Sequence, residues 1–360
     1  MKRRAFLGGS LVFLGGVIAG CRPTDTVPPT VYAPGSTLPP TAVPPTPIPA
    51  TAVPLPPIPD AVPITPLKDL YYTGYRGVPE AEDVANWSLK IDGLVDHELE
   101  LTMEDIKAMP VIEEMRTLCC ISNPVGGALI GNIVWTGVEL APILKMVGVS
   151  EKAAYVHFEA ADGYTTSLTV DRLTQDGVVL AYLANGEPLP PSHGYPLRIL
   201  IPGLYGQKQP KYITRIHFAD EDKLGYWEQE FRGWSNIAKV NTISQIREPS
   251  KDIPYTTPIR LAGFAFAGHE QITKIEIAIR TDKADPREWM AVNMIEPPSP
   301  RVWTWWTYDW SPPAPGLYRI AVRASDDTGF TQAQEAGTSM FAGAFPSGTG
   351  AIQEINLLLK

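Results

Sequence analysis

Two adjacent cysteines are the side chains best suited to chemistry in this chain. Cys119 and Cys120 lie in the run Arg116-Thr117-Leu118-Cys119-Cys120-Ile121. A thiolate is both a nucleophile and a soft metal ligand, but it needs a cation or a metal nearby to lower its pKa. A disulfide between neighbouring residues would close a strained ring, so a structural bridge is not expected. Taken alone, the pair fits two buried, inert cysteines better than a reactive thiolate.

A second group of candidates surrounds an arginine inside an apolar run. Arg198 is costly to bury there unless a carboxylate or a bound anion meets it, and its planar fork suits carboxylate or phosphate. Gly203 and Gly206 allow the backbone to approach a ligand, and two lysines follow, Lys208 and Lys211. Glycine-rich backbone with several cations can hold an anionic ligand. A loop with solvated lysines and one internal salt bridge fits these residues equally well.

Short strands and helices must position these groups. Alternation of apolar and polar residues predicts strands over 87–93 and 212–218, and short runs rich in apolar residues predict strands over 154–158 and 198–202. Helices are expected over 101–109, with Thr102 as the N-cap, and over 140–147. In the last of the strands, one face should hold Tyr212, Thr214, Ile216 and Phe218. The pattern predicts an α+β domain over residues 67–244.

The pattern changes after about residue 245. Isoleucines alternate with other residues from 275 to 279, and Tyr318, Ile320 and Val322 alternate likewise. Turn signals separate these runs, as expected of an antiparallel β-sandwich of immunoglobulin type over 245–360. The segment holds no cysteine, so the Cys…Trp…Cys pattern of antibody domains is absent.

The N-terminus has the composition of a targeting segment. Basic residues at positions 2–4 precede an apolar stretch over 5–19, which is shorter than the ~20 residues needed to span a bilayer. The stretch ends at Ile18-Ala19-Gly20-Cys21, which resembles a bacterial lipobox. We therefore expect a signal peptide over 1–20 and lipidation of Cys21. Residues 21–66 are rich in proline and poor in charge, which predicts a disordered tether.

The basic residues also fit a specific export route. The run Arg3-Arg4-Ala5-Phe6-Leu7 resembles the twin-arginine signal, which directs the export of folded proteins. Such cargo usually acquires a cofactor before export. The sequence therefore predicts a protein anchored by lipid on the outer face of the cytoplasmic membrane.

Charge and cysteine content exclude several classes of protein. The net charge of −9 and the pI of about 5.2 argue against nucleic acid as a partner, because that role needs a basic surface. The three cysteines form no C-x-x-C motif, so no zinc knuckle, covalent haem or iron–sulfur cluster is expected.

Taken together, the two candidate segments resemble the sulfite oxidase family of molybdopterin enzymes. Thr117–Asn123 resembles the family's Thr-Leu-x-Cys-x-x-Asn segment, and His193–Gly206 its His-Gly-x-Pro-x-Arg-x-x-x-Pro-Gly-x-x-Gly segment. Four shorter runs also fit: Trp135–Val138, Leu180–Pro190, Gly225–Glu228 and Gly233–Ser235. The resemblance implies a molybdopterin-binding α+β domain followed by an immunoglobulin-like domain that forms a homodimer.

The resemblance also implies roles for individual residues. Cys120 would ligate molybdenum and be the catalytic residue. The residues expected to contact the pterin and its phosphate are His193, Arg198, Gly203, Gly206, Lys208, Lys211 and Asp162. Those expected at the substrate pocket are Arg76, Tyr205 and Trp227. The implied reaction is oxygen-atom transfer, with molybdenum cycling between its +6 and +4 states and electrons passing to or from an external cytochrome or quinol-linked protein.

The sequence departs from the family pattern beside the cysteine. Sulfite oxidases carry an arginine just after Cys-x-x-Asn, whereas Pro124, Val125 and Gly126 stand here. Tyr212 also replaces the tryptophan that follows the family's lysine. The small substrate is therefore left open between a sulfite-like anion and an S- or N-oxide. Two alternatives remain: a cofactor-free surface lipoprotein with a decayed enzyme domain, and a disulfide-redox protein that uses Cys119 and Cys120.

Overall fold

The computed structural model describes residues 51–52, 54–55, 57–75, 77–79, 86–229, 231–337 and 340–360. Residues Ile48–Lys360 form one compact unit. The predicted signal peptide 1–20, Cys21, most of the predicted tether 21–66 and Arg76 lie outside the described residues. In the part of the chain that is described, no helix has the length and apolar character needed to cross a membrane.

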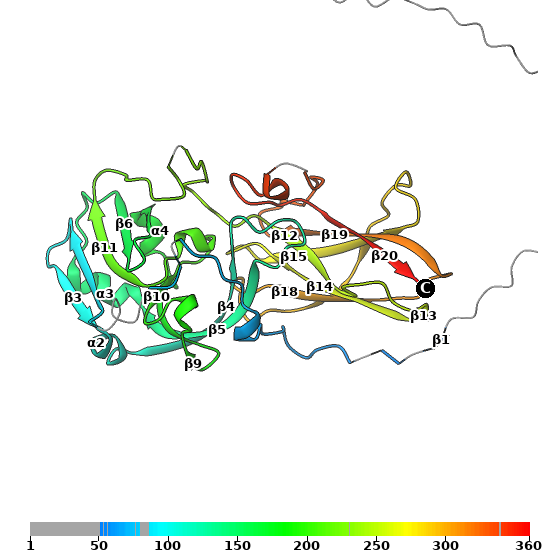
Figure 1. Cartoon of the computed structure of the whole chain (residues 1–360), viewed down its shortest axis with the longest axis horizontal. Helices are drawn as coiled ribbons and strands as arrows, with labels where there is room; N and C mark the ends of the chain where they lie inside the picture. Colours follow the sequence, from blue (N-terminus) through cyan, green and yellow to red (C-terminus); the bar gives the residue numbers. More distant parts are fainter. Residues whose placement is uncertain are drawn as a thin grey trace, which may run out of the picture. The chain divides into compact units, whose positions relative to one another are not determined.

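Two five-stranded sheets build the first part of the fold (Figure 1). One has the order β10-β8-β5-β4, and β9 pairs with β8 beside it. Its strands are β4 (Val111–Cys119), β5 (Ile130–Glu139), β8 (Val179–Ala184), β9 (Glu187–Pro188) and β10 (Arg198–Leu200). The other has the order β3-β2-β11-β6-β7. Its strands are β2 (Ser88–Gly93), β3 (Leu99–Thr102), β6 (Tyr155–Ala160), β7 (Thr165–Thr169) and β11 (Ile213–Ala219).

Short helices connect these strands. Helix α2 (Met103–Lys107) starts at Thr102, whose hydroxyl accepts from the Asp105 amide while the Asp105 carboxylate accepts from the Thr102 amide. Helix α3 (Leu140–Val147) ends at Gly148, which adopts a left-handed conformation with φ 63°. The remaining helices are α4 (Val170–Thr174), η1 (Leu67–Asp69), η2 (Pro191–His193), η3 (Gly206–Lys208) and η4 (Met340–Gly343).

The main apolar core of this part lies between the sheets and the helices. It includes Leu89 and Ile91 from β2, Ile216 and Phe218 from β11, and Ile143 from α3. All five side chains are fully buried. The α+β class expected from the sequence is confirmed.

Strand β11 departs from the expected alternation. Its pairing with β6 shifts register between Ile213 and Arg215, and the buried residues are Ile213, Ile216 and Phe218. Thr214 is only half-buried, whereas Ile216 and Phe218 are buried, so the prediction that these residues share one face with Thr214 was wrong. At this irregularity β11 has one residue more than β6. The side chains on one side of it therefore point to the opposite face from the one that simple alternation predicts.

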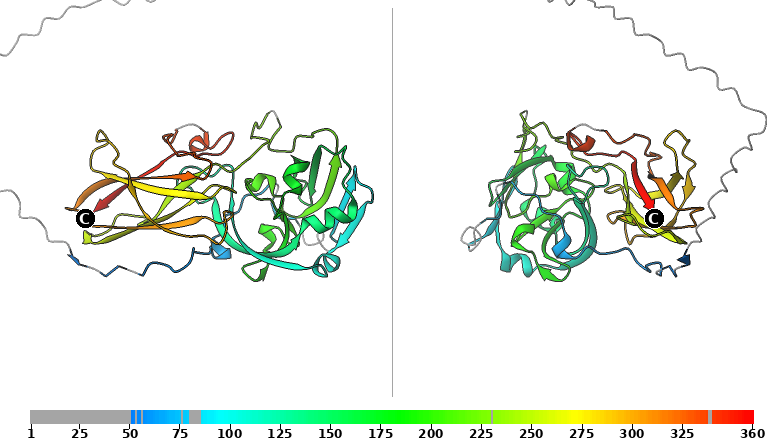
Figure 2. Two further views of the ribbon diagram at one scale, coloured as in Figure 1. Left: turned by 180° about the vertical axis from the view of Figure 1, so that it is seen from behind. Right: turned by 45° about the vertical axis from the view of Figure 1, so that its right-hand side comes forward.

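The second part of the fold consists of two four-stranded sheets. The first has the order β12-β14-β18-β17 and the second the order β16-β15-β19-β20 (Figures 1 and 2). The strands of the first are β12 (Ile243–Glu248), β14 (Ile259–Phe266), β17 (Asn293–Ile295) and β18 (Thr304–Trp310). Those of the second are β15 (Ile272–Arg280), β16 (Met290–Ala291), β19 (Gly316–Asp326) and β20 (Gln353–Leu359). A short β1 (Thr51–Ala52) pairs with β13 (Thr256–Thr257).

One core joins the two four-stranded sheets. Leu261 and Trp306 come from the first sheet, and Ile277, Ile320 and Val322 from the second. This is the packing of a β-sandwich, in which the inner faces of two sheets share a core. Its immunoglobulin type and its role in dimer formation stay predictions.

The last residues of the proline-rich segment pack on the body. Val62 is buried, and Thr65 exchanges hydrogen bonds with Asn132 through its amide at 2.7 Å and its hydroxyl at 2.9 Å. The carbonyl of Pro63 accepts from the indole of Trp303 at 3.2 Å. The folded body therefore starts before residue 67, the boundary expected from composition. Proline content predicted a tether here, but these residues satisfy their backbone groups on neighbouring strands.

Candidate active site

Cys120 is the first residue after strand β4. Its amide donates to the carbonyl of Leu129 at 2.9 Å, and its own carbonyl accepts from the amide of Asn123 at 3.1 Å, so a tight turn fixes the residue. Its Sγ lies 3.1 Å from the hydroxyl of Ser122. The side chain is partly exposed.

The neighbouring Cys119 has a different environment. Its side chain is buried at 2% exposure, within the apolar cluster beside β4. Burial, followed by the adjacent Cys120, raises the pKa of its thiol well above the ordinary value. Both cysteines are free thiols. The two neighbouring side chains thus differ: the thiol of Cys119 is buried and inert, and the thiol of Cys120 is accessible.

Cys120 opens into a cavity of about 370 Å³. That volume is in the range of small-molecule pockets, roughly 300–1,000 Å³. Of the residues predicted for the site, six others line it: Asp162, His193, Arg198, Gly206, Lys211 and Trp227. Segments far apart in the sequence therefore meet at one place.

Arg198 is a buried cation without a carboxylate partner among the described residues. Its Nη1 donates to the carbonyl of His193 at 3.1 Å, and its Nη2 contacts the carbonyl of Gln209 at 3.5 Å. Its Nε is buried and has no hydrogen-bond partner. Burial lowers its pKa to about 10, so the guanidinium stays charged at neutral pH. A buried, incompletely satisfied guanidinium facing a cavity is suited to bind an anion.

Lys211 provides a second cation on the same wall. Its Nζ donates to the carbonyls of Thr73 at 3.0 Å and Ser192 at 2.9 Å, and lies 4.2 Å from the ring centre of Tyr72. Burial, followed by the nearby charge of Arg198, lowers its pKa to about 7. An anion bound in the cavity would reverse this effect and keep the lysine charged.

His193 acts as a neutral imidazole in this arrangement. Its Nε2 lies 3.2 Å from the carbonyl oxygens of both Leu70 and Tyr71, which assigns the proton to this nitrogen. Its Nδ1 is then free to accept from the hydroxyl of Ser192 at 2.9 Å. Burial, followed by the charge of Arg198, lowers its pKa below the ordinary value. The imidazole thus fastens the segment after η1 to the cavity wall.

Gly206 lets the backbone come close to the cysteine strand. A Cβ at this position would lie 3.1 Å from the hydroxyl of Tyr71 and 3.5 Å from the carbonyl of Cys119. A side chain here would crowd the Tyr71 hydroxyl and occupy space between it and the cysteine strand.

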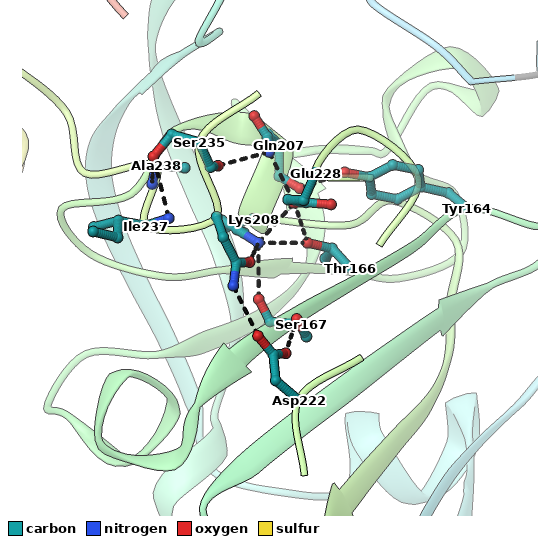
Figure 3. A network of polar contacts seen from close by, with 11 residues as sticks. Tyr164, Thr166, Ser167, Gln207, Lys208, Asp222, Glu228, Ser235, Ile237 and Ala238 are labelled. Atoms are coloured by element: carbon teal, nitrogen blue, oxygen red, sulfur yellow. Dashed lines mark hydrogen bonds and ion pairs between the residues drawn. The ribbon is translucent and has the colours of Figure 1, made fainter. Parts of the chain in front are cut away.

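Three predicted residues lie outside the lining. Gly203 packs near His269, and Tyr205 is buried, with its hydroxyl accepting from the amide of Asn241 at 3.2 Å. Lys208 is fully buried outside this lining, and its ammonium pairs with Glu228 at 2.7 Å. Figure 3 shows this ion pair. The remaining predicted residue, Arg76, lies outside the described residues.

Several lining residues were not predicted from the sequence. Gln207 and Gln209 flank Lys208, and Phe341 comes from η4 near the C-terminus. Trp234 also lines the cavity and lies 5.2 Å from Phe341 between ring centres. The Gly-x-x-Gly spacing marks the loop that holds the glutamines, but nothing in the sequence indicates that Phe341 reaches the site.

The residues present fit the molybdopterin group that the resemblance implies. The thiol of Cys120 supplies a soft sulfur donor at the cavity surface, as a high-valent molybdenum centre requires. The unsatisfied Nε of Arg198 and the ammonium charge of Lys211, which both line the cavity, suit the phosphate of the pterin.

Comparisons with known proteins agree with this site. A family model described as "Oxidoreductase molybdopterin binding domain" matches residues 75–227. The uncharacterized oxidoreductase YuiH of Bacillus subtilis (strain 168) is 41% identical over 164 residues, which cover 44% of this chain and 81% of that protein. Sulfite oxidase of Arabidopsis thaliana is 30% identical over 232 residues, covering 54% of this chain and 58% of that enzyme.

A solved structure supports the same fold. The sulfane dehydrogenase SoxCD from Paracoccus pantotrophus superposes with a TM-score of 0.69 at 23% identity, covering 82% of each chain. The match to plant nitrate reductases is partial, since the chain spans only 36% of the length of a barley enzyme. On the strength of the YuiH match and the family model, this chain belongs to the sulfite oxidase family of molybdopterin-dependent oxidoreductases.

Proposed function

We propose that this chain is an exported, lipid-anchored molybdenum-cofactor oxidoreductase that transfers an oxygen atom to or from a small substrate. The observation that carries the proposal is the meeting of the Cys120 thiol with Arg198, Lys211 and His193 in one cavity. Oxygen exchange with water balances the reaction: a sulfite-like substrate takes up oxygen and releases two protons and two electrons, and an S- or N-oxide does the reverse.

The cofactor supplies the redox step, and the protein residues hold and surround it. Cys120 would ligate the metal through Sγ, and the hydroxyl of Ser122, 3.1 Å away, would donate to the thiolate. Arg198 and Lys211 would bind the phosphate of the pterin. His193 holds the backbone of Leu70 and Tyr71 against the site.

Aromatic side chains form the rest of the wall and would exclude water from the reacting atoms. Trp227 and Trp234 line the cavity together with Phe341. An apolar wall of this kind suits the organic part of an S- or N-oxide, whereas a sulfite-like anion would call for a cation such as Arg76 near the thiolate. Both substrate classes are therefore part of the proposal.

Electrons would be exchanged with a separate carrier. The sequence contains no haem-attachment motif and no cysteine cluster for iron–sulfur ligation. A cytochrome or a quinol-linked protein in the same compartment fits this requirement. The twin-arginine motif at Arg3-Arg4 and the lipobox at Cys21 support export before anchoring on the outer face of the cytoplasmic membrane. We propose further that the sandwich domain forms a homodimer.

Metal and pterin content of protein matured in a molybdenum-sufficient host tests this proposal. We expect about one molybdenum and one pterin per wild-type chain, because the fold offers one such cavity thiol. The Cys120→Ser variant should lose activity and most of its metal, whereas Cys119→Ser, one residue away, should keep both. Absence of molybdenum from matured wild-type protein would overturn the proposal and favour a cofactor-free binding lipoprotein.

A further inference from the structure

A fully buried ammonium group lies beside the active-site cavity without facing it. The Nζ of Lys208 is 2.7 Å from the Glu228 carboxylate and donates to the Thr166 hydroxyl at 3.0 Å. It also donates to the carbonyl of Ser167 at 2.9 Å and to the side-chain oxygen of Asn236 at 2.8 Å. Figure 3 shows these contacts converging on the one nitrogen. Such a saturated ammonium has no capacity left for a ligand.

The ammonium group of Lys208 connects three separate segments. Thr166 and Ser167 belong to β7, Lys208 itself to η3, and Glu228 and Asn236 to residues 225–238. The described residues of that last segment, which we call the wall loop, form no helix or strand. The wall loop therefore lacks the hydrogen bonds of a helix or a sheet. The ion pair and the Asn236 contact hold it to residues that are distant in the sequence.

The same carboxylate binds a residue of the cavity lining. Glu228 Oε1 accepts from the side-chain amide of Gln207 at 2.8 Å and from the Thr166 hydroxyl at 2.8 Å. The backbone carbonyl of Gln207 in turn accepts from Tyr164, another lining residue, at 2.7 Å. The network therefore connects the cofactor side of the cavity with the wall loop.

The wall loop carries the aromatic side of the cavity. Trp227 precedes Glu228, Trp234 lies two residues before Asn236, and the Trp234 amide donates to the Trp227 carbonyl at 3.1 Å. The loop also sits directly against β7, since a Cβ on Gly225 would lie 2.3 Å from the carbonyl of Thr165. A small displacement of Glu228 would thus move both tryptophans.

We infer that Lys208 is a positioning residue for the substrate wall: its buried ion pair with Glu228 fixes Trp227 and Trp234, and it does not hold the cofactor. This inference rests on the proposed function for the meaning of the cavity, but not for the contacts themselves. It assigns to the pair an effect on substrate binding, while cofactor retention depends on Arg198 and Lys211.

Hydrogen exchange and cofactor content of the purified protein test the inference together. In Lys208→Met we expect amide exchange in peptides covering 225–238 to rise about tenfold or more, because the buried carboxylate loses its cation. Exchange in peptides covering 193–201 should stay at the wild-type rate, and pterin content within about twofold of wild type. The matched control is Lys274→Met, which removes an exposed lysine of β15 whose partner Glu276 keeps a second cation, Arg323, and it should change neither.

Separate effects on KM and kcat distinguish a positioning role of Lys208 from general damage to the fold. Methyl phenyl sulfoxide with reduced viologen, and sulfite with ferricyanide, are the two probes. For the probe that wild-type enzyme turns over, KM should rise about tenfold in Lys208→Met while kcat changes about twofold or less. The double variant Lys208→Met/Glu228→Met, which removes both charges, should recover much of the slow exchange in the wall loop.

Two further variants keep the test decisive if Lys208→Met does not fold. Glu228→Gln removes the negative charge beside the ammonium, and Asn236→Ala removes one of its acceptors. Both should accelerate exchange in the wall loop while retaining pterin. Loss of pterin without faster exchange in the loop would overturn the inference and return Lys208 to the cofactor site. Wild-type protein without molybdenum would instead overturn the proposed function, whereas the exchange result would still decide the role of Lys208.

Discussion

Arg198, Lys208 and Lys211 come from one short segment, yet they meet opposite environments. Lys208 is enclosed by a carboxylate, a hydroxyl, an amide oxygen and a backbone carbonyl, all within 3.0 Å. Arg198 and Lys211 instead donate to backbone carbonyls, lie beside aromatic rings and line the cavity. Burial lowers the pKa of all three, so desolvation alone does not distinguish them. The partner makes the difference. Lys208 forms a buried ion pair with a carboxylate and so holds the fold, whereas Arg198 and Lys211 are suited to bind an anion in the cavity.

The largest expected effect follows from removing a cation that lacks a carboxylate. Arg198→Met should lower cofactor content by about a hundredfold at limiting supply, because a buried, charge-assisted contact contributes about 2–3 kcal/mol. Pterin released from purified protein and measured by fluorescence checks this. Arg215→Met, which removes an arginine already paired with Asp92, is the control and should keep its pterin. Full pterin content in Arg198→Met would contradict the comparison.

The next effect is on folding rather than on the cofactor. Lys208→Met should reduce the free energy of unfolding by about 3–5 kcal/mol, because it leaves the Glu228 carboxylate buried without a cation. Urea denaturation of single and double variants measures it. Lys208→Met/Glu228→Met should regain at least half of the loss. A double variant no more stable than Lys208→Met would show that the ion pair is not the source of the effect.

A smaller effect on stability is expected from a second buried carboxylate, Asp92, which accepts hydrogen bonds from several side chains. Burial raises the pKa of Asp92, but hydrogen bonds from Arg215, His217 and Lys90 outweigh it and lower the pKa to about 2. Because the folded-state pKa lies below the unfolded value, the carboxylate stabilises the fold above about pH 4, and this contribution disappears as the pH falls towards 2.

Asp92→Asn should therefore cost about 2 kcal/mol at pH 7 and almost nothing at pH 2. Thermal unfolding followed by circular dichroism across this pH range gives the difference between variant and wild type. Cofactor content should be unchanged, because the group lies outside the cavity lining. An equal cost at both pH values would show that packing, rather than charge, explains the loss.

The smallest effect is expected where a paired lysine is solvent-exposed. The side chain of Lys274 is 54% exposed beside Glu276, and such pairs contribute only about 0–1 kcal/mol. Lys274→Met should therefore alter neither the urea midpoint nor pterin content beyond experimental error. A loss of stability comparable with that of Lys208→Met would show that burial of the ion pair does not determine the size of the effect.

Local patterns predicted the elements and the lining residues that depend on them. The capping residue Thr102 and the terminating Gly148 define α2 and α3 as expected, and the motif around His193 supplies side chains that do line the cavity. These features depend on neighbouring residues, so one sequence is enough to indicate them.

Features that depend on distant segments could not be predicted in this way. Lys208 and Lys211 look alike in the sequence, and only the position of Glu228 and Asn236 decides that the first is enclosed. Phe341 reaches the cavity from a segment far along the chain. Thr214 was misplaced because an irregular register in β11 carries no mark in the pattern of apolar residues.

The central claim is that Cys120, and not Cys119, would hold the metal of a molybdenum cofactor. X-ray absorption at the molybdenum edge tests it most directly, because it counts the sulfur neighbours of the metal. Wild type and Cys119→Ser should show the same sulfur shell, and Cys120→Ser, in whatever molybdenum it retains, should show one sulfur fewer. An unchanged sulfur shell in Cys120→Ser, or a sulfur lost in Cys119→Ser, would contradict the account.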